Sequence, residues 1–115
     1  MTTRVYLPLT LGQLATSYAE GEVVVTAAVV VAVDDSEDQE YAALMTAADA
    51  STALLDGPGR RVVVVAELDK EPEPGWTIPM KRIVAVHADT ADRPVDADPD
   101  DDLGWFGTQE IPYLI

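Results

Sequence analysis

The chain has 115 residues, and its 21 acidic side chains outnumber the 7 basic ones to give a formal net charge of −14. A charge of this sign repels nucleic-acid phosphates and anionic membrane surfaces, so we expect neither nucleic acid nor a membrane among its partners. The sequence contains no cysteine, which excludes disulfides, thiol nucleophiles and cysteine-based zinc sites.

The composition predicts one folded domain over residues 1–115. An apolar share of 48% is typical of globular proteins and argues against disorder throughout the chain. The N-terminal residues lack the features of a signal peptide. The longest apolar stretch, residues 23–33, is far shorter than the roughly 20 residues that a membrane helix needs. We therefore expect a cytoplasmic protein.

The first third of the chain predicts a strand, a helix and a second strand. Arg4–Leu9 has the β-branched and aromatic residues of a short strand. Thr10 and Gln13 have the spacing of a capping box, and Gly21 follows where a short amphipathic helix would end. Residues 23–33 are almost entirely apolar and rich in valine, which predicts a central strand buried on both faces.

The clearest helix is predicted between Ser36 and Gly57. Ser36 and Gln39 repeat the capping-box spacing, acidic residues crowd the first turn, and Gly57 ends the pattern. One face of this helix carries the side chains that we expect to pack inward, namely Tyr41, Leu44, Met45, Ala48, Thr52 and Leu55.

The second half of the chain predicts two strands and an acidic loop. Arg61–Leu68 is a valine run, and Thr77–Asp89 reads as another strand after a proline-rich connection. Residues 89–102 contain seven aspartates, which predicts a solvated and flexible loop. Residues 103–115 are apolar again and predict a short terminal helix or turn.

This order of elements predicts an α/β (α+β) fold of two layers. Helices between the early strands require crossover connections, so we expect the first two strands to be parallel and the last two to pair antiparallel. The expected sheet is mixed and four-stranded, in the order β-α-β-α-β-β with a terminal helical turn. A thioredoxin-like arrangement fits this order, a ferredoxin-like one is the alternative, and neither carries a function with it.

Three alternating aspartates in the acidic loop, Asp96, Asp98 and Asp100, suggest a calcium site of the helix-loop-helix kind. However, the glycine position of that motif holds Asp101, and its bidentate glutamate position holds Gly107. We therefore predict no metal site and no cofactor, and only weak, nonspecific binding of divalent cations at these aspartates.

His87 is the one histidine of the sequence, and Asp89 follows it on the same face of the predicted strand. With Glu110 nearby, the two could act as a base and its orienting carboxylate. A serine nucleophile is missing, because the sequence has no G-x-S-x-G motif. Catalysis by these three residues is therefore the weaker hypothesis, and a hydrogen-bonded histidine at a strand end is the stronger one.

The apolar C-terminal segment predicts a flap that packs on the sheet beside the first strand, because apolar residues are usually buried. The alternative is an exposed docking patch for a partner. The residues that would form this patch are Trp105, Phe106, Gln109, Glu110 and Tyr113. We expect Gln109 and Glu110 to lie near His87.

Several stretches resemble a small actinobacterial family known as domain of unknown function 6912. They are "RVYLPLTLGQL", "EYAALMTAA", "RRVVVVAEL", "IVAVHAD" and "WFGTQEIPYLI", of which the last is the most specific. The resemblance implies no activity, cofactor or catalytic residue. It does imply positions that follow the family pattern, and their polar members are candidates for a shared surface: Tyr6, Pro8, Tyr41, His87, Asp89, Gln109 and Glu110.

Two functions remain open. The preferred one is a small, acidic, non-enzymatic binding or regulatory module that interacts with a basic protein partner. The alternative is a small hydrolase-like enzyme that uses His87, Asp89 and Glu110. The charge could also serve solubility alone, and the sequence leaves a homo-oligomer possible.

Overall fold

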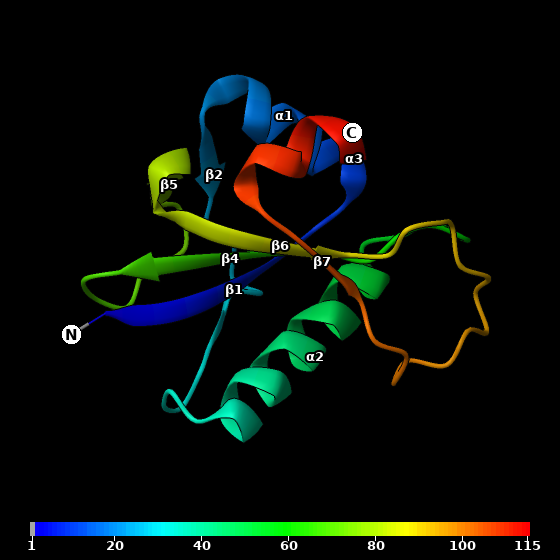
Figure 1. The fold of residues 1–115 in the computed structure, drawn as a ribbon, viewed down its shortest axis with the longest axis horizontal. Coiled ribbons are helices and arrows are strands. Elements are labelled where there is room, and N and C mark those ends of the chain that lie inside the picture. Colours follow the sequence, from blue (N-terminus) through cyan, green and yellow to red (C-terminus); the bar gives the residue numbers. More distant parts are fainter. Residues whose placement is uncertain (1) are drawn as a thin grey trace.

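The computed structural model describes residues 2–115 and shows three layers (Figure 1). The middle layer is a five-stranded sheet in which every neighbouring pair of strands is antiparallel. Its strands lie in the order β3 (Val30–Val31), β1 (Thr3–Leu9), β4 (Val62–Leu68), β6 (Ile83–Ala88) and β7 (Gly104–Phe106).

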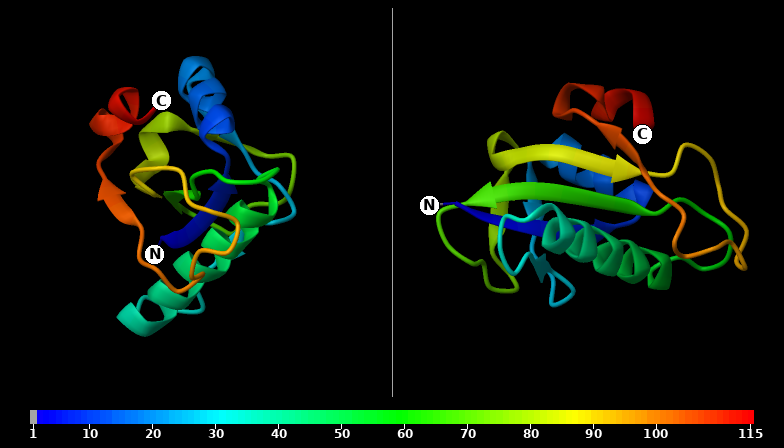
Figure 2. Two further views of the ribbon diagram at one scale, coloured as in Figure 1. Left: turned by 90° about the vertical axis from the view of Figure 1, so that its right-hand side faces the viewer. Right: turned by 60° about the horizontal axis from the view of Figure 1, so that its bottom comes forward.

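The two faces of this sheet carry different layers, which Figure 2 shows from two further sides. The long helix α2 (Glu37–Ala53) covers one face. The other face carries the remaining elements, which are α1 (Leu11–Glu20), α3 (Ile111–Leu114), and a two-stranded sheet of β2 (Glu22–Val24) and β5 (Thr77–Pro79). Two short 3-10 helices, η1 (Met80–Arg82) and η2 (Thr108–Glu110), complete the fold.

Strand β4 lies at the centre of the sheet and is buried on both faces. Val62 and Val64 pack in the core on the α1 side, whereas Val63 and Val65 pack under α2. Successive side chains of a strand point to opposite faces, so a continuous valine run serves two cores at once. The predicted strand is confirmed, as is its antiparallel pairing with β6.

The predicted helix starts are confirmed, because they depend on local hydrogen bonds. The Thr10 hydroxyl accepts a hydrogen bond from the Gln13 N–H at 3.1 Å, and the Gln13 side-chain oxygen accepts one from the Thr10 N–H at 3.0 Å. Gly21 ends α1 in the left-handed region at φ +78°, as expected of a helix C-terminus. At the start of α2 the Ser36 hydroxyl accepts the Gln39 N–H at 3.3 Å, but the Ser36 N–H donates to Asp34 Oδ1 at 2.9 Å, so only half of the predicted capping box is formed. Within residues 2–115, no helix is long and apolar enough to cross a membrane.

The buried face of α2 differs from the prediction. The helix is buried along a row of small residues that lets it approach the sheet closely, namely Ala43, Ala47, Ala48 and Ser51. Of the expected inward residues, Ala48 is buried, but Tyr41 is 51% exposed and Leu44 is half-buried at the side. The prediction of the buried face failed because it followed the large apolar side chains, whereas small side chains contribute little to a hydrophobic pattern.

Residues 23–33 do not form one central strand, so that prediction is wrong. They divide into β2, which pairs with β5 in the second sheet, and β3, a two-residue edge strand of the main sheet. Between them, the Thr26 hydroxyl accepts a hydrogen bond from the Ala28 N–H at 3.3 Å and the Thr26 carbonyl accepts one from Val29. This local turn interrupts the valine run, as hydroxyl side chains often do.

The predicted sheet of four strands with a parallel pair is also wrong, because it required residues 23–33 to return as one strand. The predicted strand Thr77–Asp89 is divided as well, since η1 redirects the chain from β5 into β6. Over residues 2–115 the fold is a small mixed α and β structure with three α-helices, a five-stranded antiparallel sheet and a two-stranded one. Neither the thioredoxin-like nor the ferredoxin-like arrangement is confirmed.

The C-terminal segment packs on the sheet, but at a different place from the one predicted. It lies beside β6 through the edge strand β7, and not beside β1. The helical turns η2 and α3 then fold onto the α1 face, where Ile111 is completely buried and Leu114 packs against the same core. The Thr108 hydroxyl fixes this return with a 3.1 Å bond to the Ile83 carbonyl.

Ile111 should therefore be an important contributor to stability. We expect Ile111→Ala to lower the free energy of unfolding by about 2–5 kcal/mol, because it leaves a cavity in the core. Tyr113→Ala is the matched control, since Tyr113 is 89% exposed on the same helix and should change stability by less than about 0.5 kcal/mol. Urea unfolding measures both, and equal stabilities of the two variants would contradict the burial of Ile111.

Candidate functional site

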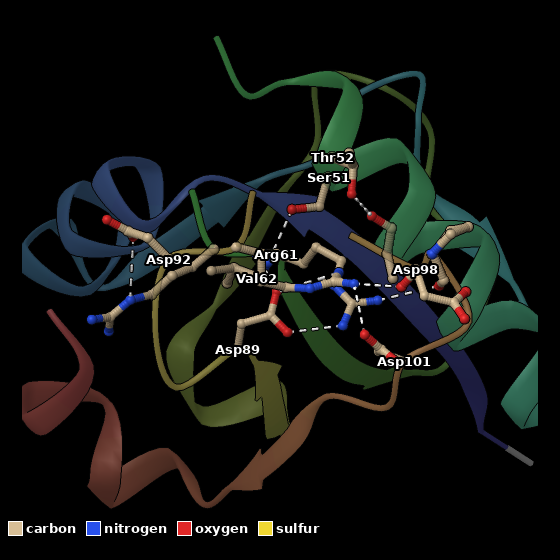
Figure 3. A network of polar contacts seen from close by, with 12 residues as sticks. Ser51, Thr52, Arg61, Val62, Asp89, Asp92, Asp98 and Asp101 are labelled. Carbon is tan, nitrogen blue, oxygen red and sulfur yellow. Dashed lines mark hydrogen bonds and ion pairs between the residues drawn. The ribbon is translucent and has the colours of Figure 1, made fainter. Parts of the chain in front are cut away.

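Asp89 forms a buried ion pair with Arg61. The Arg61 guanidinium donates two hydrogen bonds to this carboxylate, from Nε to Oδ2 at 2.9 Å and from Nη2 to Oδ1 at 2.8 Å. The Arg61 backbone N–H adds a third at 2.8 Å, and the Asp89 N–H donates to the Arg61 carbonyl at 3.1 Å. Figure 3 shows this network at the end of β6 and the start of β4.

The same corner anchors the acidic loop, residues 89–102. Arg93 pairs with Gly59 through two backbone hydrogen bonds of 2.8 and 3.1 Å, and its side chain donates to the Asp98 carbonyl and to Asp101. Arg61 Nη1 reaches the Pro99 carbonyl at 3.4 Å. The segment forms a loop, as predicted, but it is fastened to the sheet and to the α2–β4 connection by arginines.

The surroundings of Asp89 favour its ionised form. Burial alone would raise the pKa of this carboxyl group, but the hydrogen bonds from Arg61 and the charges of Arg61 and Arg93 outweigh it and lower the pKa. Asp89 therefore serves as a structural anion, and its oxygens are already bound.

His87 lies in a groove between α2 and the sheet, which we call the α2 groove. It has a volume of about 310 Å³ and is lined by Arg4, Tyr6, Val65, Ala85, His87 and Trp105 from the sheet and by Glu37, Glu40, Tyr41 and Leu44 from α2. His87 reaches this face because its neighbours Val86 and Ala88 point to the α1 core. Its strand partners are Val63 and Trp105.

Within residues 2–115, burial and the charge of Arg4 act on the imidazole of His87, and no hydrogen bond does. Burial lowers the pKa of this ring, and the positive charge of Arg4 lowers it further. At neutral pH the ring is therefore uncharged and keeps both a donor and an acceptor for a ligand.

Two carboxylates on the first turns of α2 border the α2 groove. Glu40 is half-buried, and the Arg4 guanidinium lies 3.8 Å from its carboxylate, beyond hydrogen-bond distance. Glu37 belongs to the first turn of the helix. A carboxylate that is partly removed from water and accepts no hydrogen bond from the protein favours a cationic ligand.

Aromatic side chains form the other border. Trp105 is 62% exposed on β7, although it faces the α2 side of the sheet. Tyr41 donates a hydrogen bond of 2.9 Å to Asp102, which connects α2 to the end of the acidic loop and raises the pKa of the phenol. The α2 groove thus combines aromatic faces with carboxylates.

The other predicted partner-binding residues lie elsewhere. Phe106 points to the α1 core, and Tyr113 is exposed on α3 at the opposite face of the sheet from Trp105. Gln109 lies in η2 beside Gly107, and the Glu110 carboxylate accepts the Gly107 N–H at 3.0 Å. The expected contact of Gln109 and Glu110 with His87 is therefore not formed, and the structure does not bring His87, Asp89 and Glu110 into one hydrogen-bond network.

Asp96, Asp98 and Asp100 show no arrangement for a metal ion. Asp98 accepts the Asp100 N–H at 2.9 Å, which closes a local turn. Within residues 2–115, no group of three or more histidine and carboxylate side chains is placed to hold a metal.

Sequence reasoning missed the residues that complete the α2 groove around His87. Arg4 and Glu40 belong to no sequence motif, because the contact between their side chains depends on how α2 lies across β1. Tyr6 and Tyr41 appeared among the positions implied by the resemblance, together with His87, and the structure brings these three to one groove.

Comparison with known proteins identifies one family. Its model, described as a family of unknown function (DUF6912), matches residues 3–115. No curated protein and no solved structure matches the chain at a significant level.

Removing the Asp89 charge should destabilise the fold strongly, because Arg61 would remain buried without its partner. We expect Asp89→Asn to cost about 3–5 kcal/mol at pH 7. A folded-state pKa below the unfolded value of about 3.9 means that this stabilisation is complete above that pH and is lost as the pH falls through the folded-state pKa. Urea unfolding at pH 7 and pH 3 should show the difference between variant and wild type shrinking at the lower pH. The control is Asp92→Asn, whose exposed carboxylate pairs loosely with Arg60 at 3.6 Å; an equal effect of the two variants would contradict the role of Asp89.

His87 should titrate below the ordinary histidine value of about 6.5, because burial and Arg4 disfavour its charged form. Its contribution to stability is complete above that value and is lost as the pH falls through the lowered pKa, since the unfolded chain binds the proton first. NMR titration of the imidazole protons measures this pKa directly. Arg4→Gln should raise it, and an unchanged value would show that Arg4 does not act on the ring.

Proposed function

We propose that this chain, which belongs to the family of unknown function DUF6912, is a non-enzymatic binding module that takes a cationic side chain of a basic protein partner into the α2 groove. The observation that carries this proposal is the juxtaposition of a half-buried Glu40 carboxylate, which accepts no hydrogen bond from the described residues, with the exposed ring of Trp105. Carboxylates beside aromatic faces bind ammonium and guanidinium groups through charge and cation–π attraction.

The shape of the α2 groove suits a side chain rather than a large surface. About 310 Å³ accommodates one long side chain, and Tyr6, Tyr41, Ala85 and Trp105 are among the residues that would contact it. His87 supplies an uncharged hydrogen-bonding group on the floor, which does not repel a cation. The partner therefore contributes a lysine or an arginine side chain.

The net charge of −14 supports the same partner class at longer range. An acidic molecule attracts basic partners and accelerates their encounter, most strongly at low salt. We place this interaction in the cytoplasm. Specificity then arises in the α2 groove, because a general charge attracts every basic protein alike.

A hydrolase receives less support. Asp89 is bound by Arg61, Glu110 by the Gly107 N–H, and neither orients the His87 ring. The described lining of the α2 groove contains no serine or threonine to act as a nucleophile beside His87.

The proposal predicts that an arginine-containing octapeptide binds to the α2 groove and that its citrulline counterpart, which has the same shape without the charge, does not. Glu40→Gln should weaken binding at least about fivefold, because an ion pair becomes a neutral contact. Trp105→Ala should weaken it by a similar factor through the loss of cation–π contact. NMR shifts of the His87 imidazole and the Trp105 indole measure the dissociation constant.

Two matched controls separate the α2 groove from general charge and aromatic effects. Glu71→Gln removes one exposed negative charge in the loop before β5, and Tyr113→Ala removes an exposed aromatic ring on the opposite face. Both should bind the peptide as the wild type does. Equal binding of the arginine and citrulline peptides would overturn the proposal, and so would equal losses in Glu40→Gln and Glu71→Gln.

A further inference from the structure

Arg4 already places a guanidinium at the border of the α2 groove. It lies opposite Glu67 across the β1–β4 pair, and the two side chains form a direct hydrogen bond. Its other nitrogen, Nη1, stands 3.8 Å from Glu40. Arg4 is therefore bound firmly to one carboxylate and loosely to the other.

The position of this side chain has two open sides. Arg4 and Glu40 line the α2 groove, and they also line a neighbouring acidic pocket of about 580 Å³ that includes Asp34, Asp35 and Glu67. The Arg4–Glu40 pair thus separates the α2 groove from the acidic pocket and is not packed in the core. Both side chains are partly exposed, so the pair can separate without opening buried structure.

We propose that Arg4 is an intramolecular competitor for the cation that the α2 groove binds, held back from Glu40 by Glu67. This inference rests on the proposed function, because it concerns the same site and the same carboxylate. In the free protein Arg4 partly neutralises Glu40. When the basic side chain of the partner enters the α2 groove, it forms an ion pair with Glu40, and Arg4 keeps its hydrogen bond to Glu67.

Glu67 is a positioning residue in this scheme. Its hydrogen bond draws the Arg4 guanidinium along the sheet, away from α2, and leaves Glu40 without a hydrogen-bond donor. Without Glu67, the Arg4 guanidinium can form a hydrogen-bonded ion pair with Glu40. The carboxylate would then no longer be available to the partner. Removing Arg4 and removing Glu67 should therefore change binding in opposite directions.

The effect of Arg4 should be modest in size, because the contact with Glu40 is partly exposed to water. We expect Arg4→Gln to bind the arginine octapeptide about two- to fivefold more tightly than the wild type, in line with the measured strength of exposed ion pairs. Arg60→Gln is the matched control, since it removes one positive charge at the end of β4 opposite to Glu67 and breaks the exposed pair with Asp92. Over this distance its effect should be largely screened at 0.1 M salt.

Glu67→Gln should weaken binding of the same peptide relative to Glu71→Gln, which removes an equal charge without touching Arg4. Arg4→Met is a second variant of the competitor, and it keeps the aliphatic part of the side chain on the sheet. Thermal unfolding of each variant confirms that the fold is intact before binding is compared. The probe in every case is the arginine octapeptide, with the citrulline peptide as its uncharged reference.

The outcomes distinguish this inference from the proposed function. Tighter binding in Arg4→Gln and Arg4→Met than in Arg60→Gln, together with weaker binding in Glu67→Gln, supports the inference that Arg4 competes for Glu40. Binding of the arginine octapeptide to Arg4→Gln and Arg4→Met but not to the wild type also supports competition by Arg4. If the wild type binds the arginine octapeptide and Arg4→Gln binds it equally or more weakly, the inference that Arg4 competes for Glu40 is wrong. The proposal that the α2 groove binds a cation is then still supported. Failure of every variant to bind overturns both.

Discussion

The rest of the structure depends on the buried ion pair between Arg61 and Asp89, which joins the start of β4 to the end of β6. Arg61 precedes β4 and Asp89 follows β6, so their hydrogen bonds fasten one end of the two central strands together. The same guanidinium reaches the Pro99 carbonyl and so brings the acidic loop back to the sheet, from which β7 continues along β6. Two buried charges are costly unless every oxygen and N–H is bound, and here the backbone and both side chains provide those bonds.

The same physical criterion separates the structural carboxylate from the one that we assign to binding. Asp89 accepts three hydrogen bonds and is 7% exposed, whereas Glu40 accepts none from the described residues and stands beside a groove. Groups whose bonds are complete stabilise the fold, and groups whose bonds are missing have interactions left for a ligand. His87 belongs with Glu40 on this criterion, although its sequence position had suggested a partnership with Asp89.

Much of the local structure could be predicted from the sequence, because its causes are local. The capping bonds of Thr10 and Ser36 and the left-handed Gly21 involve residues within a few positions of one another. The valine run of β4 is also a local signal. The family was recognisable too, since the matched model covers residues 3–115. The helical ending of the chain was expected, and its place beside β6 was not.

The amino-acid sequence by itself determined the acidic charge, the caps, the central strand and the apolar ending. Tertiary structure decided that the two halves of residues 23–33 would pair in different sheets, that α2 would bury its alanines instead of its larger residues, and that Arg4, Glu40 and His87 would line one groove. These outcomes rest on contacts between segments far apart in the chain, where packing outweighs propensity and hydrophobic pattern. A groove built from such contacts leaves no motif in the sequence, because its members come from β1, α2, β4, β6 and β7.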